Sequence, residues 1–316
     1  MKNWPKNIYI DAFKPYYLAV MILLMLPFNE AKAQQAIQFS QYFSNQLVLN
    51  PAYAGSDDAL SLTLVHRNQW TGVQGAPKTT TVSGHTLFKN EHTGLGVNLF
   101  VDKINIHSNV NFNGIYSYRI KTGSKSYLSL GLSAGINYNK SDYNSLLASI
   151  NDPNDPNIRF EKLSESAFQF GTGVFYKSPK VEIGLSAPIL YSSSSGISEE
   201  SSGNMPHYFV FARYKMKLSP SLQFSPSVLL KSKKDWPVSY DINAEVLIKE
   251  VLMVALSYRS AETLSTIVQV KLLPQMKFGY SYDIPLSEIQ KRNFNSHEIM
   301  LNYIFKYKDY NASTPR

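Results

Sequence analysis

A period of two in hydropathy, repeated along most of the chain, is the feature that most constrains its fold. Between about residues 60 and 305, short segments alternate apolar with polar residues and are separated by turns. In Met276–Ile284, for example, every even position is apolar or aromatic and every odd position is polar or small. This period places the two sets on opposite faces of a β-strand. The chain is therefore predicted to be all-β, as a soluble sandwich with an apolar core or a transmembrane barrel with apolar faces toward lipid.

About fourteen strands are predicted, an even number, as in single-chain bacterial barrels. Several have one clean apolar face, as in Leu95–Val101, Leu128–Tyr138 and Leu252–Tyr258, with polar residues such as Asn98 and Ser129 on the other. The predicted strands are 59–67, 78–88, 93–102, 109–120, 126–139, 166–177, 181–190, 207–218, 221–230, 238–248, 251–259, 264–273, 275–284 and 297–306.

The connections between these strands alternate in length. Those after even-numbered strands are tight, as at Ser178–Lys180 and Ser219–Pro220. Those after odd-numbered strands are longer as a group and include Lys140–Glu165 and Tyr191–Pro206, which are expected to be extracellular. Short periplasmic turns and long outer loops are typical of outer-membrane barrels, whereas a sandwich has no reason to sort its loops in this way. The pattern favours a transmembrane antiparallel β-barrel with both chain ends in the periplasm.

The first 33 residues are typical of a secretory signal peptide. Three lysines precede an apolar run, Tyr17–Leu26, and Ala31–Ala33 is a small-x-small cleavage pattern. The run is too short for a spanning helix, which needs roughly 20 apolar residues. The expected organisation is a signal peptide in residues 1–33, a periplasmic or plug-like segment in 34–58, a barrel in 59–306 and a short tail in 307–316.

Composition excludes several classes of function. The chain has no cysteine, which rules out disulfides, thiol catalysis and a lipoprotein anchor. Loss of residues 1–33 would remove four lysines and two acidic residues, lowering the formal net charge from +8 to +6. The remaining basic residues are dispersed in an exported protein, so nucleic-acid binding is not expected. The 21 tyrosines and 17 phenylalanines suit the aromatic girdles of a membrane barrel.

The segment 34–58 is too short and irregular to span a membrane. It is also apolar, with Leu47, Val48, Leu49 and Tyr53, and a proline follows Asn50 and fixes a turn. Exposed apolar clusters usually mark a contact surface or a packed segment. We expect the segment to pack at the periplasmic mouth or inside the lumen; the alternative is a simple lead-in to the first strand.

Three motifs near the N-terminus identify a family. Gln38–Phe43 (QFSQYF), Asn50–Ser56 (NPAYAGS) and Arg67–Gly72 (RNQWTG), followed by Gly75–Lys78 (GAPK), resemble the PorP/SprF family of outer-membrane proteins from type IX secretion and gliding systems of Bacteroidota. The resemblance implies a barrel that contacts lipid and acts through protein partners. If the protein is a core component, its expected partners are periplasmic secretion components. If it is a dedicated helper, its expected partner is a cognate secreted adhesin.

Family-motif residues are the candidate partner contacts, with two open alternatives. Arg67 could instead pair with a carboxylate inside the lumen, and Trp70 could belong to an aromatic girdle. The candidates are Phe39, Tyr42, Asn50, Pro51, Tyr53, Gly55, Arg67, Asn68, Gln69, Trp70, Gly75 and Pro77.

No catalytic, cofactor or metal site is predicted. Ser83 and His85 share one strand face, but no third group of a triad is fixed by the sequence. Asp152 and Asp155 lack EF-hand spacing and suit a solvated turn. No small-molecule substrate is expected for an interaction protein of this kind. A porin-like or solute-transporting barrel is the alternative function, and a wide, unplugged lumen would favour it.

Overall fold

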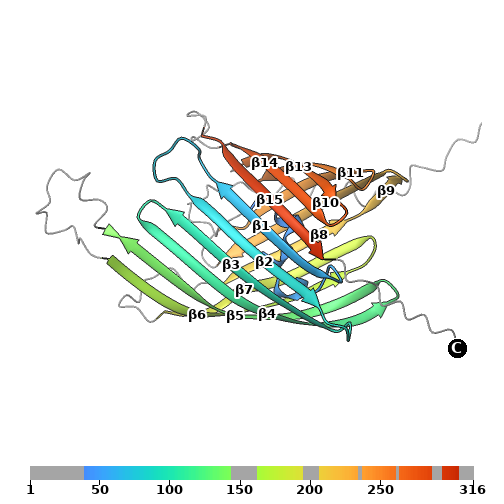
Figure 1. Ribbon diagram of the computed structural model, residues 1–316, viewed down its shortest axis with the longest axis horizontal. Helices are drawn as coiled ribbons and strands as arrows, with labels where there is room; N and C mark the ends of the chain where they lie inside the picture. The colour runs from blue at the N-terminus through green and yellow to red at the C-terminus, as the bar shows by residue number, and fades with distance from the viewer. Residues whose placement is uncertain are drawn as a thin grey trace, which may run out of the picture. The chain divides into compact units, whose positions relative to one another are not determined.

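The computed structural model describes residues 39–143, 162–194, 206–233, 237–260, 263–286 and 294–305. The predicted signal peptide and the whole predicted C-terminal tail lie outside them. Figure 1 shows strands that run obliquely and side by side around one barrel. The strands are β1 (Leu60–Asn68), β2 (Lys78–Leu87), β3 (Thr93–Ile104), β4 (His107–Gly123), β5 (Ser126–Asp142), β6 (Lys162–Lys177), β7 (Val181–Ser194), β8 (His207–Tyr214), β9 (Met216–Ser219), β10 (Leu222–Lys233), β11 (Ser239–Ile248), β12 (Leu252–Arg259), β13 (Thr263–Leu273), β14 (Met276–Pro285) and β15 (Ser296–Phe305).

The sheet closes on itself. β1 pairs with β2 and also with β15, in an antiparallel register that runs from Leu60 opposite Phe305 to Asn68 opposite His297. β8 and β9 both pair with β10 and form one wall strand that is interrupted at Lys215, and β10 also pairs with β11. The result is a closed antiparallel barrel of fourteen strands, which confirms the predicted fold class. Closure satisfies the backbone of every wall strand without leaving an open sheet edge.

The two faces of the wall have the predicted chemistry. Apolar residues point outward, and Leu132 and Leu256 are 61% and 55% exposed. Residues of the opposite parity, such as Asn98 and Ser129, are buried inside. An outward apolar surface of this kind faces lipid in a membrane barrel. Among the described residues, no helix is long and apolar enough to cross a membrane.

The two ends of the barrel differ in their connections, with exceptions. We call the end with residues 88–92, 124–125, 178–180, 220–221, 249–251 and 274–275 the turn side and the opposite end the loop side. On the loop side, residues 69–77 form a long connection, but β3 and β4 are joined by Asn105 and Ile106 alone. Loop length is therefore less strictly sorted than the sequence suggests, because β3 and β4 continue their ladder to the tip of a tight hairpin.

The expected loops Lys140–Glu165 and Tyr191–Pro206 are partly wrong. β5 and β6 remain paired to Asp142 opposite Lys162, and β7 extends to Ser194. The middle parts of both segments lie outside the described residues. The reason is that a ladder of backbone hydrogen bonds does not need an apolar side-chain face, so polar Asn and Ser residues continue the strands beyond the apolar stretch.

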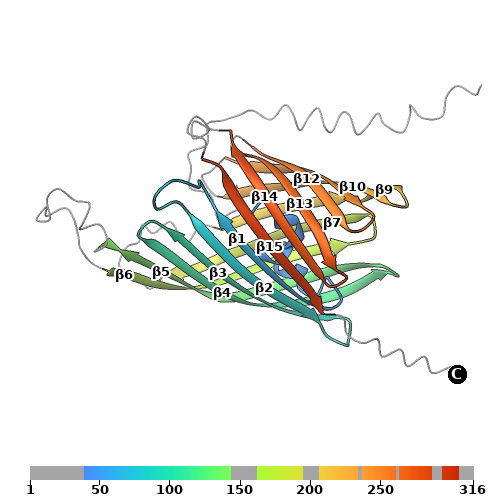
Figure 2. The same ribbon diagram turned by 45° about the horizontal axis from the view of Figure 1, so that its top comes forward.

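The interior is occupied by residues 39–58, which we call the plug. The plug contains three short 3-10 helices, η1 (Tyr42–Ser44), η2 (Gln46–Val48) and η3 (Pro51–Tyr53). Figure 2 shows this segment, in blue, inside the ring of strands. Most of its side chains are buried. The barrel core is thus built from the plug and the inward wall residues.

Candidate functional site

The middle of the plug is shaped by the Asn50–Pro51 pair. The Asn50 side-chain oxygen accepts a hydrogen bond from the Ala52 N–H at 2.9 Å and caps η3, and Pro51 occupies the first position of that helix. Proline suits this position because its fixed φ is helical and no N–H is needed there. The pair therefore makes a compact turn with its own backbone groups satisfied.

Asn50 also ties this turn to the wall. Its amide nitrogen donates to the carbonyl oxygens of Val174 on β6 and Leu185 on β7, at 3.0 and 3.4 Å. The facing wall is made of glycines: a Cβ at Gly131 would collide with the Ala52 backbone, and one at Gly173 with the Asn50 side chain. Glycine in a strand allows another backbone to approach closely. The wall is thus hollowed where the plug lies against it.

The turn-side end of the plug is held by Ser117 and Arg119 on β4. The Ser117 hydroxyl donates to the Ala54 carbonyl at 2.7 Å, and the Arg119 guanidinium donates to the Gly55 carbonyl at 2.5 Å. Arg119 also pairs with Asp58 at 2.6 Å. Gly55 has φ of +81°, a conformation that glycine adopts without strain. This end is fixed through the plug backbone as well as its side chains.

Asp57 and His85 form a second contact at the same end. The His85 Nδ1 accepts from the Gly55 N–H at 3.2 Å, and its Nε2 lies 3.5 Å from the Asp57 carboxylate. Burial raises the pKa of Asp57, but the attraction of His85 and Lys177 outweighs it, so this pKa lies below its ordinary value. Asp57 is thus held ionised.

The loop-side end of the plug is held by an ion-pair cluster. Arg67 on β1 lies 2.5 Å from the Asp283 carboxylate on β14 and 3.3 Å from Glu298 on β15. The Glu298 carboxylate accepts hydrogen bonds from the backbone N–H groups of Ser40 and Gln41, both at 2.9 Å. The Ser40 hydroxyl donates to Asp283 at 2.7 Å.

All three charged side chains of this cluster are nearly inaccessible to solvent. Breaking such a buried cluster by removing one partner costs about 3–5 kcal/mol, because the charges that remain are uncompensated. The alternative left open by the sequence, in which Arg67 pairs with a carboxylate inside the lumen, is therefore observed. The same cluster also binds the plug.

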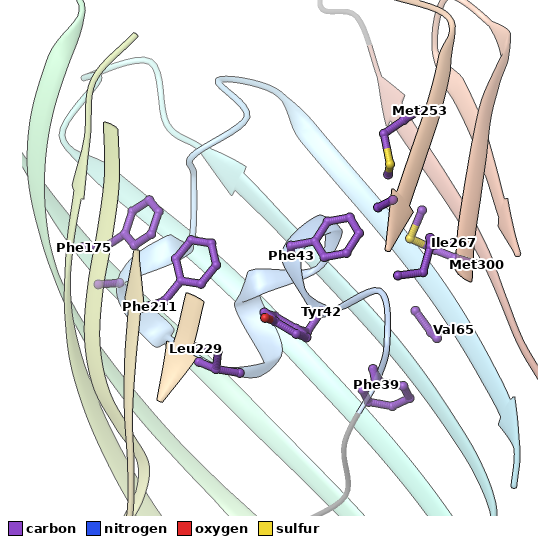
Figure 3. Close-up of a cluster of buried hydrophobic side chains, with 12 residues drawn as sticks. Phe39, Tyr42, Phe43, Val65, Phe175, Phe211, Leu229, Met253, Ile267 and Met300 are labelled. Atoms are coloured by element: carbon purple, nitrogen blue, oxygen red, sulfur yellow. The ribbon is translucent and has the colours of Figure 1, made fainter. Parts of the chain in front are cut away.

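Between these ends, apolar side chains of the plug fill the lumen. Figure 3 shows Phe39, Tyr42 and Phe43 projecting from the plug among residues of the surrounding strands. Tyr42 packs edge-on against Phe211 on β8, with ring centroids 6.3 Å apart, and its hydroxyl accepts from the Asn243 amide at 2.5 Å. The cluster comprises Phe39, Tyr42, Phe43, Ala52, Val65, Phe175, Phe211, Leu229, Met253, Ala255, Ile267 and Met300.

The remaining predicted residues form a separate group at the loop-side rim. Asn68 ends β1, and the connection beyond it is closed by the Gln69 N–H donating to the Pro77 carbonyl at 3.0 Å. The backbone N–H of Trp70 donates to the Ser296 hydroxyl at 3.1 Å, and the Gly75 carbonyl accepts from the backbone N–H of Asn105 at 2.9 Å. The structure therefore divides the predicted site residues into a plug group and a rim group.

Several residues of the site are absent from the sequence prediction. The partners of Arg67 are Asp283 and Glu298, more than 200 residues away in the chain. Arg119 and Ser117 were also missed. Both lie on the polar, inward parity of β4, so the alternation does not distinguish them from other inward residues, and nothing in the sequence pairs them with the plug.

Ser83 and His85, which share the inward face of β2, both contact the plug. Ser83 donates to the Asn45 side chain at 2.8 Å, and His85 is engaged with Gly55 and Asp57. Both residues of the predicted strand face therefore serve the plug. Within the described ranges, no three His, Asp or Glu side chains are grouped to bind a metal ion.

Comparison with known families decides the identity of the chain. The model described as type IX secretion system membrane protein PorP/SprF matches residues 31–303, which include the plug and nearly the whole wall. The chain belongs to the PorP/SprF family. As a member of the PorP/SprF family with a closed antiparallel barrel, it resides in the outer membrane, where its apolar face contacts lipid.

Solved structures resemble this PorP/SprF barrel in fold. The CymD monoaromatic hydrocarbon channel is 11% identical, with 84% of this chain and 93% of that chain covered and a TM-score of 0.50. The outer membrane protein Omp33 of Acinetobacter baumannii is also 11% identical, with 78% and 98% covered and a TM-score of 0.43. At such identity the likeness bears on the fold alone. No curated protein matches this chain.

Proposed function

We propose that this protein is a non-enzymatic component of the type IX secretion machinery that acts by protein–protein contact. In this role it supports secretion or surface attachment of cargo such as a large adhesin. The observation that carries the proposal is the bound plug. The family motifs that begin the mature chain are built into the barrel interior, where Asn50, Arg67 and Arg119 contribute three separate attachments.

A lumen filled in this way suits a role in binding rather than in free passage. Apolar rings occupy the centre of the barrel, and polar contacts hold both ends of the plug. A porin passes its solutes through a polar, water-filled path. The porin-like alternative therefore requires that the plug leave its place, which the attachments oppose.

Partners can reach the protein from either side of the membrane. In the proposed orientation, the turn side faces the periplasm and its secretion components, and the loop side faces the cell exterior and a secreted adhesin. The rim group around Trp70 and the plug are the proposed contact surfaces. Whether this protein is a core component or a dedicated helper is decided by which proteins co-purify after mild detergent extraction.

Deletion of residues 34–46 tests the proposal. The deletion retains the signal sequence and Asn50 but removes the two N–H donors to Glu298 and the Tyr42 ring. We expect the barrel to assemble, judged by heat-modifiable migration, while cargo secretion or display fails or planar bilayers show new conductance. Deletion of residues 307–316 is the control and should change neither. Normal secretion together with unchanged conductance in the plug deletion would refute the proposed role.

A further inference from the structure

A cavity lies at the turn-side mouth of the barrel, beside the plug. Its volume is about 440 Å³. Its inner wall is formed by the plug residues Phe43, Tyr53 and Asp57, and its rim includes Pro220 and Glu250 from two of the short turns. The cavity therefore extends from the plug to the turn-side rim.

The charges deep in this cavity are paired. Arg213 lies 3.3 Å from Glu182 and 2.8 Å from Glu245, and Lys215 lies 2.5 Å from Glu182. Nearer the rim, Lys217, Lys271 and Lys277 also line the cavity, and none of them has an ion pair within the described part of the chain. Glu250 adds a negative charge at the rim, and Asp57 and Glu245 are close enough to attract Lys277. The lining as a whole nevertheless carries more basic than acidic side chains, and the excess comes from these three lysines.

Two of these lysines are placed directly opposite each other. Lys271 on β13 and Lys277 on β14 are cross-strand partners in the antiparallel register. Both belong to the inward parity of their strands, which also carries the buried residues Gln269 and Gly279. Like charges at directly opposed positions are destabilising. Asp57 and Glu245 offset part of this repulsion, and a bound anion between the two lysines would reduce it further.

We infer that this cavity is a docking site for an acidic segment of a partner protein, whose carboxylates are received by Lys217, Lys271 and Lys277. The inference rests on the proposed function, because it gives the chemistry of one contact within the secretion machinery. The lysines face the lumen, so lipid headgroups around the outer wall do not meet them. The cavity opens on the side that is proposed to face the periplasm, where a partner segment can enter.

Segments of this chain are poor candidates for the same place. Residues 306–316, which follow β15 at the turn side, carry Lys306, Lys308 and Arg316 against Asp309 alone. Residues 34–38 have no charge. Asp152 and Glu199 lie outside the described residues, and the strand ends that precede and follow them in the chain are at the loop side. Charge complementarity therefore favours a separate protein.

The test measures binding of a fluorescein-labelled hexaglutamate peptide to the detergent-solubilised full-length protein by fluorescence anisotropy. We expect binding that weakens with added salt, since exposed charges are screened. The K271E/K277E variant should bind about tenfold more weakly, which corresponds to about 1.4 kcal/mol. The matched control is K125E/K180E, which makes the same charge change at exposed positions of the same mouth outside the cavity. The control should bind as the parent does.

Each other outcome overturns the inference. Absence of binding to the parent does so, as does an equal loss in both double variants, which would indicate a diffuse charge effect. Displacement of the peptide by millimolar inorganic phosphate or by anionic lipid vesicles would assign the cavity to a small anion or a lipid instead. Heat-modifiable migration of each variant verifies that it folds. Failure of the proposed function is recognised separately, because cells that lack the whole gene would then secrete normally.

Discussion

At the scale of single residues, glycines determine where the plug meets the wall. Gly131 on β5 faces the backbone of Ala52, and even one added carbon atom would overlap it. Gly114, on the neighbouring strand β4, has room for a side chain. A carbon atom added there would lie 3.8 Å from the Ala134 carbonyl oxygen, which is an ordinary contact distance. The same residue type therefore has a specific role at one position and a tolerant one at the other.

We expect Gly131→Ala to displace the η3 turn from the wall, at a cost of about 1–3 kcal/mol, as for other overpacked sites. Conductance in planar bilayers should appear, and protease should cut the plug in the purified protein. Gly114→Ala is the control and should retain a closed, protected lumen. If both variants behave as the parent does, the plug is not held by this close approach.

At the scale of elements, successive side chains of each strand point alternately toward the lipid and toward the lumen. Leu132 on β5 points outward, whereas Asn137 on the same strand points inward and is half-buried. The inward serines Ser129 and Ser257 are almost fully buried. Because both are enclosed by neighbouring atoms, they leave little room for a long side chain. Whether an inward position tolerates a long side chain therefore depends on what surrounds that position.

Leu132→Arg should destabilise the barrel by about 2–4 kcal/mol, the cost of a cation on the lipid face near the membrane centre. Asn137→Arg should be milder, because this position lies on the polar inward face away from the plug turns. The measurement is the temperature at which each barrel loses its heat-modifiable migration. Equal losses at both positions would contradict the assigned faces.

Alternation along the strands was sufficient to predict the barrel, because lipid and lumen impose opposite chemistry on successive residues. The outward faces around Leu95, Leu130 and Leu256 followed directly from it. The ends of β5, β6 and β7 did not, since backbone pairing continues through polar residues. Nor could the sequence pair Arg67 with Asp283 and Glu298, because long-range ion pairs leave no periodic pattern.

At the scale of the whole molecule, the proposed orientation has a direct test, because the chain contains no cysteine. A single cysteine at Gln74 reports on the loop side, and one at Lys125 reports on the turn side; both positions are exposed. In intact cells, a membrane-impermeant maleimide should label Gln74→Cys and spare Lys125→Cys. Both should react once the outer membrane is opened. The reverse pattern would invert the barrel.

The contact between Glu298 and the backbone of Ser40 and Gln41 joins residues 258 and 257 positions apart. Glu298 lies on β15, the strand that completes the wall by pairing with β1. The first plug residues can therefore reach this acceptor only after the last strand has been synthesised. The contacts of Asn50 with β6 and β7, and of Gly55 with Arg119 on β4, do not involve β15. We therefore expect a chain truncated before β15 to retain the turn-side attachments of the plug while its loop-side end loses the Glu298 contacts.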